Sequence, residues 1–453
     1  MRKKNRKQMT LINASLDHPR AVELENISQI LDDNPTICDM VLQDLTRGVK
    51  NRKAGAEGMT AEQVLRVAII KQMEEFSYEE LAFHIVDSRC YRRFCRIGIT
   101  EKGFQKSALN SNIKAISPET WEAINRILVA YAEERKVEKG REVRMDCTVV
   151  SSNIHDPRDS SLLFDCVRVL TRKLGQINEW CSDLNILFSD HTKRAKRRMI
   201  GIMNTNSKKV RDKRYEDLLK VTHKTVNYAE KAVVILKDFP FQNSTLIDTA
   251  LQLSEDMEQI INLSYRVIDQ TTRRIIHGES VPASEKVVSI FEPHTDIIVK
   301  DRRETFYGHK VCLSGGSSNL ITDCLILEGN PADSTLTNIM LDRQKEIYNR
   351  YPLKVALDGG FASKDNLESA KGNGIKDVCF AKKRGIEVED MCRSEYVYKR
   401  LRRFRAGVES GISWLKRCFG FALVTWKTLR SFKSYVWASI VSANLLTLAR
   451  NVK

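Results

Sequence analysis

Residues 141–150 read REVRMDCTVV, and this alternating stretch decides the fold class of the chain. Apolar side chains take every second position, which is the period of a β-strand with one buried face. Asp146 falls on the opposite face. The turn cluster NIHDPRDSS, residues 153–161, follows directly and ends the strand. We therefore predict that an α/β sheet begins here.

A helical region precedes this strand. Residues 59–135 have helical patterns, and Thr60 with Gln63 and Ser77 with Glu80 have the spacing of capping boxes at helix starts. The motif at Ser77 and Glu80 begins a short helix, which is followed by a turn and a second, basic helix. This arrangement resembles a helix-turn-helix, which many helical domains show by chance.

The segment after the strand is again helical, and strands return only beyond it. Residues 160–280 contain one proline, Pro240. Three strands in succession, then alternating helices and strands, predict a mixed α/β sheet with a helical insertion after its first strand. We expect helices at 160–188, 207–238, 243–277, 334–350, 394–417 and 430–450, and strands at 286–291, 308–314, 320–327, 353–358 and in DVCFA, residues 377–381.

The net charge of +16 is concentrated in three segments. Residues 391–453 contain 13 Lys and Arg but only two acids, and residues 192–221 contain 11 against three. The first seven residues hold five more. Clustered positive charge is typical of proteins that bind nucleic-acid phosphates, whereas any single cluster could be a solvated helix face. The three together favour nucleic acid.

Several protein classes are excluded. No apolar run is long enough to span a bilayer, and no apolar signal sequence follows the basic N-terminus. The 11 cysteines are scattered without a CxxC pair, which argues against a zinc finger and fits reduced thiols. We expect a cytoplasmic protein without membrane association.

Three carboxylates are candidates for a metal site. Asp146 lies within the first strand, Asp358 ends the apolar strand LKVALD before Gly-Gly, and Glu409 is one of the two acids of the basic C-terminal segment. Carboxylate oxygens suit Mg²⁺ or Mn²⁺. Two such ions can activate a water or a 3′-hydroxyl and stabilise the leaving oxygen in phosphoryl transfer. An ion pair of Glu409 with Arg405, four residues earlier, is the alternative interpretation.

Basic residues share the helix face of Glu409. Arg402, Arg405, Glu409 and Lys416 follow one another at offsets of 3, 4 and 7 residues. A neighbouring apolar stripe would pack this helix on the sheet. The stripe consists of Leu401, Val408, Ile412, Leu415 and Phe419.

These motifs resemble the DDE transposases of bacterial insertion sequences. RAGVESGISWLK, residues 405–416, is similar to the Arg-x3-Glu-x6-Lys signature around the family's catalytic Glu. The family often has a Tyr three residues before that Arg, where this chain has Arg402. ALDGGFAS resembles the motif of the second Asp, and MDCTVVSSNIHDPRDSSLL that of the first. The likeness covers about residues 56–450 and is greatest to the ISNCY type.

The resemblance implies an RNase H-like catalytic core, here with a mixed five-stranded sheet, that cuts DNA at the ends of its element and joins the 3′-OH to target DNA. Asp146, Asp358 and Glu409 would be catalytic and hold two Mg²⁺ or Mn²⁺ ions, and Arg402, Arg405 and Lys416 would contact DNA. A homodimer would act on the two ends. The expected domains are a basic arm with short helices (1–55), a helical DNA-binding domain (56–138), the catalytic domain (139–159 and 281–453) and a helical insertion (160–280).

Other residues have plainer interpretations. Asp156, Asp159 and His155 are expected in a turn, with Asp159 as a helix cap, and Asp323 lies in a strand without metal-site context. Trp414 and Trp426 could stack on a base but are more often core residues. Two other functions stay open: a general RNase H-like nuclease, and a decayed element that only binds DNA.

Overall fold

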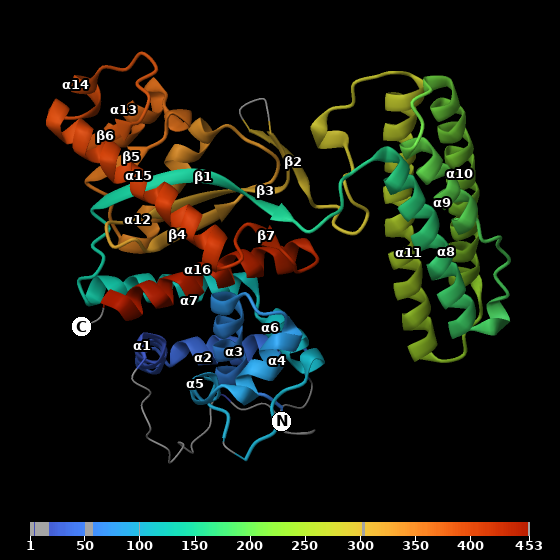
Figure 1. The fold of residues 1–453 in the computed structure, drawn as a ribbon, viewed down its shortest axis with the longest axis horizontal. Helices are drawn as coiled ribbons and strands as arrows, with labels where there is room; N and C mark the ends of the chain where they lie inside the picture. Colours follow the sequence, from blue (N-terminus) through green and yellow to red (C-terminus); the bar gives the residue numbers. More distant parts are fainter. Residues whose placement is uncertain (1–3, 5–17, 50–57, 99, 301–303, 452–453) are drawn as a thin grey trace. The chain divides into compact units, whose positions relative to one another are not determined.

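The computed structural model describes residues 4, 18–49, 58–98, 100–300 and 304–451. The chain forms two compact units (Figure 1). The first joins residues 1–153 to residues 309–453, and the second comprises residues 154–308. The basic arm at residues 1–7 lies, apart from Lys4, outside the described residues.

The first unit begins with short helices whose starts are set by their capping residues. Thr60 and Gln63 form a reciprocal capping box, and so do Ser77 and Glu80, which confirms both predicted helix starts. Ser117 caps a further helix that carries proline at its first position. These helices are α1 (Pro19–Asp33), α2 (Thr36–Leu45), α3 (Ala61–Glu74), α4 (Tyr78–Asp87), α5 (Arg89–Phe94), α6 (Lys106–Ala115) and α7 (Pro118–Glu134).

A mixed sheet follows, which confirms the predicted fold class. Among the described residues its order is β2-β3-β1-β5-β6, with β4 paired to β3 and β7 paired to β1, so the sheet has seven strands, whereas the family resemblance implied five. Strands β1, β5 and β6 are mutually parallel, whereas β3 and β4 are antiparallel. The strands are β1 (Glu142–Ser152), β2 (Asp296–Lys300), β3 (Glu304–Gly315), β4 (Ile321–Ile326), β5 (Lys354–Leu357), β6 (Asp377–Phe380) and β7 (Leu423–Val424).

Helices alternate with the later strands. The parallel connection between β5 and β6 runs through α13, as βαβ units require. The helices of this part are α12 (Thr337–Tyr348), α13 (Lys364–Gly372), α14 (Val388–Met391), α15 (Glu395–Cys418) and α16 (Leu429–Asn451).

The second unit is mostly a bundle of helices (Figure 1), and it also contains β2 and the first residues of β3. Its apolar faces form a core of their own. One predicted strand is wrong: residues 286–291 are not a strand. Val287 instead exchanges backbone hydrogen bonds with the Gln270 side chain and buries its own side chain in the bundle. The bundle helices are α8 (Asp159–Trp180), α9 (Thr192–Met203), α10 (Lys208–Asp238) and α11 (Ser244–Thr271).

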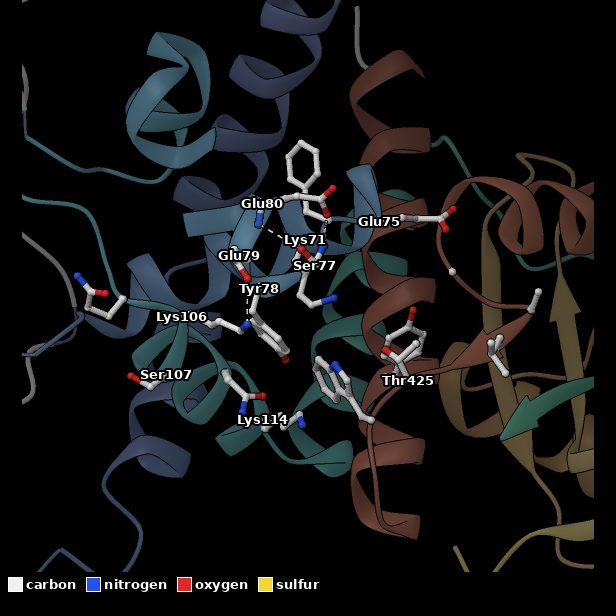
Figure 2. Close-up of a pocket in the computed structure, with 18 of the residues that line it drawn as sticks. Lys71, Glu75, Ser77, Tyr78, Glu79, Glu80, Lys106, Ser107, Lys114 and Thr425 are labelled. Carbon is white, nitrogen blue, oxygen red and sulfur yellow. Dashed lines mark hydrogen bonds and ion pairs between the residues drawn. The ribbon is translucent and has the colours of Figure 1, made fainter. Parts of the chain in front are cut away.

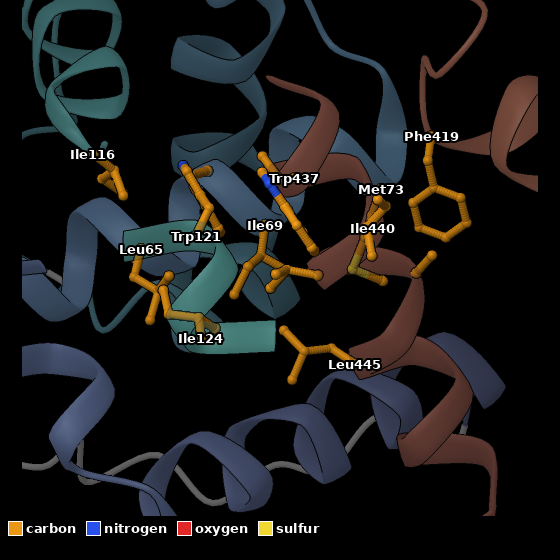
Figure 3. Close-up of a cluster of buried hydrophobic side chains, with 14 of the residues drawn as sticks. Leu65, Ile69, Met73, Ile116, Trp121, Ile124, Phe419, Trp437, Ile440 and Leu445 are labelled. Carbon is orange, nitrogen blue, oxygen red and sulfur yellow. The ribbon is translucent and has the colours of Figure 1, made fainter. Parts of the chain in front are cut away.

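Helix α16 lies at the centre of the first unit's largest core. It packs against α7, α1 and α3, so the C-terminal helix completes the N-terminal helical region. Trp437 and Ile440 of α16 meet Ile69 of α3 and Trp121 of α7 in this core (Figure 3). Because partners cover it on several sides, α16 is buried nearly all round its circumference, and its few buried polar residues are small Ser, Thr and Asn side chains.

Arg66 is expected to be important for the stability of the N-terminal helices. Its side chain is 1% exposed and donates to Glu62, Asp32, Ser28 and the carbonyl of Phe94. Arg66→Met would remove the donor to Ser28 and to the Phe94 carbonyl, and would leave Glu62 and Asp32 with Arg96. We expect the free energy of unfolding to fall by about 3 kcal/mol, measured by denaturant unfolding.

Arg93→Met is the matched control. Arg93 forms one ion pair, with Glu25, and both side chains are more than 40% exposed. The same substitution there should cost less than about 1 kcal/mol. If both variants lost the same unfolding free energy, the burial of Arg66 would not be the reason for its importance.

Candidate active site

Two of the candidate carboxylates lie side by side because of the register of two strands. Strands β1 and β5 are parallel, with Met145 opposite Leu357. Asp146 follows Met145 in β1, and Asp358 follows Leu357, the last residue of β5. Both aspartates therefore lie where the pairing of β1 with β5 ends, at its carboxyl end. Asp358 directly precedes the short 3₁₀ turn Gly359–Phe361.

The third carboxylate is brought to the same edge by α15. This helix begins after the N-cap Ser394 and packs across β1, β5 and β6 (Figure 1). Glu409 lies on its exposed side. Its packing follows the apolar stripe predicted from the sequence. The stripe residues Leu401, Val408, Ile412, Leu415 and Phe419 are all buried.

Arg405 joins the three carboxylates. Its Nη1 lies 3.5 Å from Asp146 Oδ2 and 3.3 Å from Asp358 Oδ1, while its Nη2 donates to Glu409 Oε1. The pair of Arg405 with Glu409 is the i, i+4 contact expected from the spacing. One guanidinium therefore bridges acids from two strands and a helix.

Burial decreases outward across the site. The Asp146 side chain is 18% exposed, that of Asp358 39% and that of Glu409 57%. Burial raises the pKa of Asp146 to about 6, against the opposing effect of Arg405, and the charges of Asp358 and Glu409 raise it further. Negative charge is therefore costly at the innermost carboxylate, and a cation beside it relieves that cost.

The ligand chemistry fits a hard divalent cation. The site offers carboxylate oxygens and neither sulfur nor imidazole, which is the donor set that Mg²⁺ and Mn²⁺ prefer. The carboxylates are, however, arranged around a guanidinium. Across the described ranges, no three His, Cys, Asp or Glu side chains are close enough together to hold one ion. A bound ion would have to take carboxylates that now contact Arg405.

Arg144 positions the helix that carries Glu409, and sequence reasoning missed this role. It lies two residues before Asp146 on β1 and is buried. Its Nη1 donates to the carbonyl of Phe404 in α15 at 3.1 Å, its Nη2 donates to Asn319, and its guanidinium stacks on the Phe404 ring. The sequence did contain a hint of this role, because strand alternation places the charged Arg144 on the same face as Asp146.

Gly407→Ala is predicted to disturb this link. A Cβ at Gly407 would lie 1.8 Å from Arg144 Nη1, and Arg144 can retreat only by giving up buried hydrogen bonds. We expect a loss of about 1–3 kcal/mol in the free energy of unfolding. Gly411 lies one turn later on the same helix, and a Cβ there would contact only Ile321, at 4.0 Å. Gly411→Ala should therefore raise the free energy of unfolding by up to about 1 kcal/mol. A stabilised Gly407→Ala protein would refute the positioning role.

The remaining predicted DNA contacts lie along the same helix. Arg402 is exposed one turn before Arg405. Lys416 is half-buried and lines a cavity near the end of α15 (Figure 2).

The rival residues have structural roles. Asp323 is buried and paired with Arg343, and burial raises its pKa. Trp414 and Trp426 belong to the core of the first unit, as favoured from their spacing.

The turn residues of the second unit also have local partners. Asp159 is the first residue of α8 rather than its cap and binds Arg274 at 2.7 Å. Asp156 pairs with Arg158, and His155 lies 3.3 Å from Asp165. No metal-binding role is needed to account for these side chains.

Comparison with known proteins identifies the family. Residues 282–445 match the family described as transposase DDE domain, and residues 13–115 match a transposase domain (DUF772). The first match includes Asp358 and Glu409, whereas Asp146 lies between the two matches. None of the curated proteins and none of the solved structures matches the chain. Within the described residues, no helix is long and apolar enough to cross a membrane. The chain is a DDE-type transposase of an insertion sequence, with an RNase H-like catalytic domain that acts on DNA.

Proposed function

We propose that Asp146, Asp358 and Glu409 hold two Mg²⁺ or Mn²⁺ ions and that this site cleaves DNA at the ends of the element and joins them to target DNA. The observation that supports this most is the convergence of all three carboxylates on Arg405. Like charges gather in this way only where a cation compensates them. When bound, the ions would activate the attacking oxygen and stabilise the leaving oxygen.

The chain's own cations would bind the DNA backbone beside the metals. Arg405 would turn from the carboxylates to a phosphate when an ion arrives, because both the ion and the guanidinium compete for the same oxygens. Arg402 and Lys416 would hold the strand along α15 on either side of Glu409. These contacts orient the DNA but do not read its sequence.

The wider organisation is part of the same proposal. Residues 56–138 would recognise the element ends, residues 139–159 with 281–453 would carry out catalysis, and residues 160–280 would form an inserted helical domain. The ISNCY type is the subgroup that we infer. Two protomers would cut the two ends, and a mass measurement on the protein–DNA complex that finds one protomer would refute this.

Metal removal tests the proposed reaction. Purified protein with Mg²⁺ or Mn²⁺ should nick a duplex that carries the element end and then join it to a target plasmid. Chelation with EDTA should abolish both products, measured on denaturing gels. Joining that persists in EDTA would contradict the metal mechanism.

The products also separate the other two functions. Cleavage without preference for the end sequence, and without joined products, would indicate a general nuclease. Binding to the end without any cleavage in either metal would indicate a decayed element.

A further inference from the structure

The basic segment at residues 192–221 lies on α9 and the first half of α10, within the helical bundle of the second unit (Figure 1). Helix α9 contains five Lys and Arg and no acid, and α10 contains nine against five acids. Helix α11 has the opposite balance, with one Arg and five acids. Both α9 and α11 pack against α8 and α10. Charge is therefore segregated within the bundle, whereas a surface that only keeps a protein soluble has both signs interspersed.

Five lysines form a stripe along the exposed face of α10. This lysine stripe consists of Lys209, Lys213, Lys220, Lys224 and Lys231. Spacings of four and seven residues place them on one face of the helix, and all five are exposed. Leu218, Ala229 and Leu236 lie on the opposite face and are buried in the core of the bundle. At about 1.5 Å of rise per residue, the stripe is about 33 Å long.

The protein itself leaves the charge of this stripe uncompensated. Among the described residues, none of the five ammonium groups forms an ion pair or a hydrogen bond. Lys209 with Lys213, and Lys220 with Lys224, are like charges four residues apart, an arrangement that destabilises a helix. A row of anions bound along the stripe would relieve this repulsion.

Helix α9 adds further cations and is firmly attached to α10. Asp217 of α10 accepts from both Arg194 and Arg198 of α9, and Arg214 donates to the carbonyl of Gly201. The charge of Asp217 is therefore taken up by α9 and does not compensate the stripe. The side of α9 that faces away from the core carries three more exposed cations, and none of them forms an ion pair with a described residue. They are Lys193, Lys196 and Arg197.

We infer that the lysine stripe binds the phosphate backbone of duplex DNA without reading its sequence, and that the exposed cations of α9 extend this surface. Phosphates offer a regular row of negative charge, and one turn of DNA spans about 34 Å, close to the length of the stripe. Lysine binds a phosphate as a point charge on a flexible stem, so the contact does not depend on the base. The inference rests on DNA being the substrate, and it gives the helical insertion a role that the catalytic carboxylates do not supply.

A protein partner fits the stripe less well than DNA does. The centres of protein–protein interfaces are depleted in lysine and enriched in aromatic residues. The residues that interrupt the stripe, Glu216 and Asn227, are polar as well. The acidic α11 of a second copy is the oppositely charged surface that the chain itself offers, and the experiment below distinguishes it from DNA.

The salt dependence of DNA binding tests the inference on the full-length protein. Two duplexes of equal length are compared, one with the element end and one of unrelated sequence. The double substitution Lys220→Gln and Lys224→Gln should weaken binding to both roughly tenfold. It should also reduce the slope of log affinity against log salt by about two, one for each phosphate contact. The ratio of the two affinities should stay the same, because backbone contacts carry no sequence information.

The double substitution Lys345→Gln and Lys376→Gln is the matched control. It removes the same charge from two exposed lysines of the first unit, one in the last turn of α12 and one immediately before β6. Affinity should stay within about twofold and the slope should not change. Thermal unfolding verifies the fold of both proteins. The midpoint of the Lys220 and Lys224 variant should be unchanged or slightly higher, since a like-charge pair is removed.

Protection from an amine-reactive reagent provides a second measurement that needs no substitution. The protein is labelled alone and with a saturating duplex, and the modified lysines are identified by mass spectrometry. DNA should reduce labelling of Lys209, Lys213 and Lys220 by at least about threefold. Labelling of Lys345 and Lys376 should be the same in both samples.

Two outcomes would overturn the inference. The first is an unchanged salt slope in the Lys220 and Lys224 variant together with equal labelling of the stripe in free and DNA-bound protein. The second is dissociation of a DNA-free dimer by this variant, seen in sedimentation, with an unchanged salt slope, which would assign the stripe to a second copy of the chain. Failure of the proposed function has a different signature, namely strand transfer by the Glu409→Gln protein.

Discussion

Glu409→Gln is expected to lower strand transfer by at least about a thousandfold, which corresponds to roughly 4 kcal/mol of lost transition-state stabilisation. The amide keeps the size and hydrogen-bonding reach of the side chain but removes the charge that a metal ion requires. Because Glu409 is 57% exposed, the fold should be unaffected. DNA binding should persist, since removing an acid beside phosphates does not weaken that attraction.

Glu395→Gln is the matched control for this change. Glu395 is the other acid of α15, lies in its first turn and pairs with Lys399 at 3.0 Å. Both side chains of this pair are more than 60% exposed, so the pair contributes little to stability. Strand transfer should remain within about twofold of the parent protein. Undiminished transfer by Glu409→Gln would remove Glu409 from the catalytic set.

Arg405→Gln is expected to change metal binding and catalysis in opposite directions. The substitution removes a positive charge that contacts all three carboxylates, and therefore a competitor of the metal ion. Affinity for Mn²⁺ should rise by at least about tenfold, because like charges a few ångströms apart repel by more than 1.4 kcal/mol even at a dielectric constant of about 20. Strand transfer should fall by roughly a hundredfold, since a phosphate contact is lost.

Titration of Mn²⁺ by electron paramagnetic resonance measures the affinity, and single-turnover joining assays measure the rate. Arg403→Gln is the control, because Arg403 is exposed on the same helix and carries the same charge. It should change Mn²⁺ affinity much less. Unchanged or weaker Mn²⁺ binding by Arg405→Gln would show that the guanidinium and the metal do not share ligands.

Local patterns in the sequence predicted the elements that carry the site. The alternation around Asp146, the apolar strand before Asp358 and the apolar stripe of α15 each depend on neighbouring residues, and each element formed as predicted. The capping boxes at Thr60 and Ser77 formed for the same reason. Such features depend on hydrogen bonds and packing within a few residues.

Features that depend on distant parts of the chain were not predictable. The contact of one arginine with acids on β1, β5 and α15 follows from the strand register, which a single sequence does not reveal. The role of Arg144 requires Phe404, 260 residues away. The sequence around Val287 has a strand-like pattern, but its backbone forms hydrogen bonds with the Gln270 side chain and its own side chain packs in the core of the helical bundle.

Crystals of the protein soaked with Mn²⁺ provide the most direct measurement, because anomalous scattering locates the ion independently of activity. We expect anomalous density among the carboxylates of Asp146, Asp358 and Glu409, at about 2.2 Å from their oxygens, with the Arg405 side chain moved away. The Glu409→Gln protein should lose part of this density. Density elsewhere in the molecule, in crystals whose protein still transfers strands with Mn²⁺, would contradict the assignment of the three carboxylates as the catalytic site.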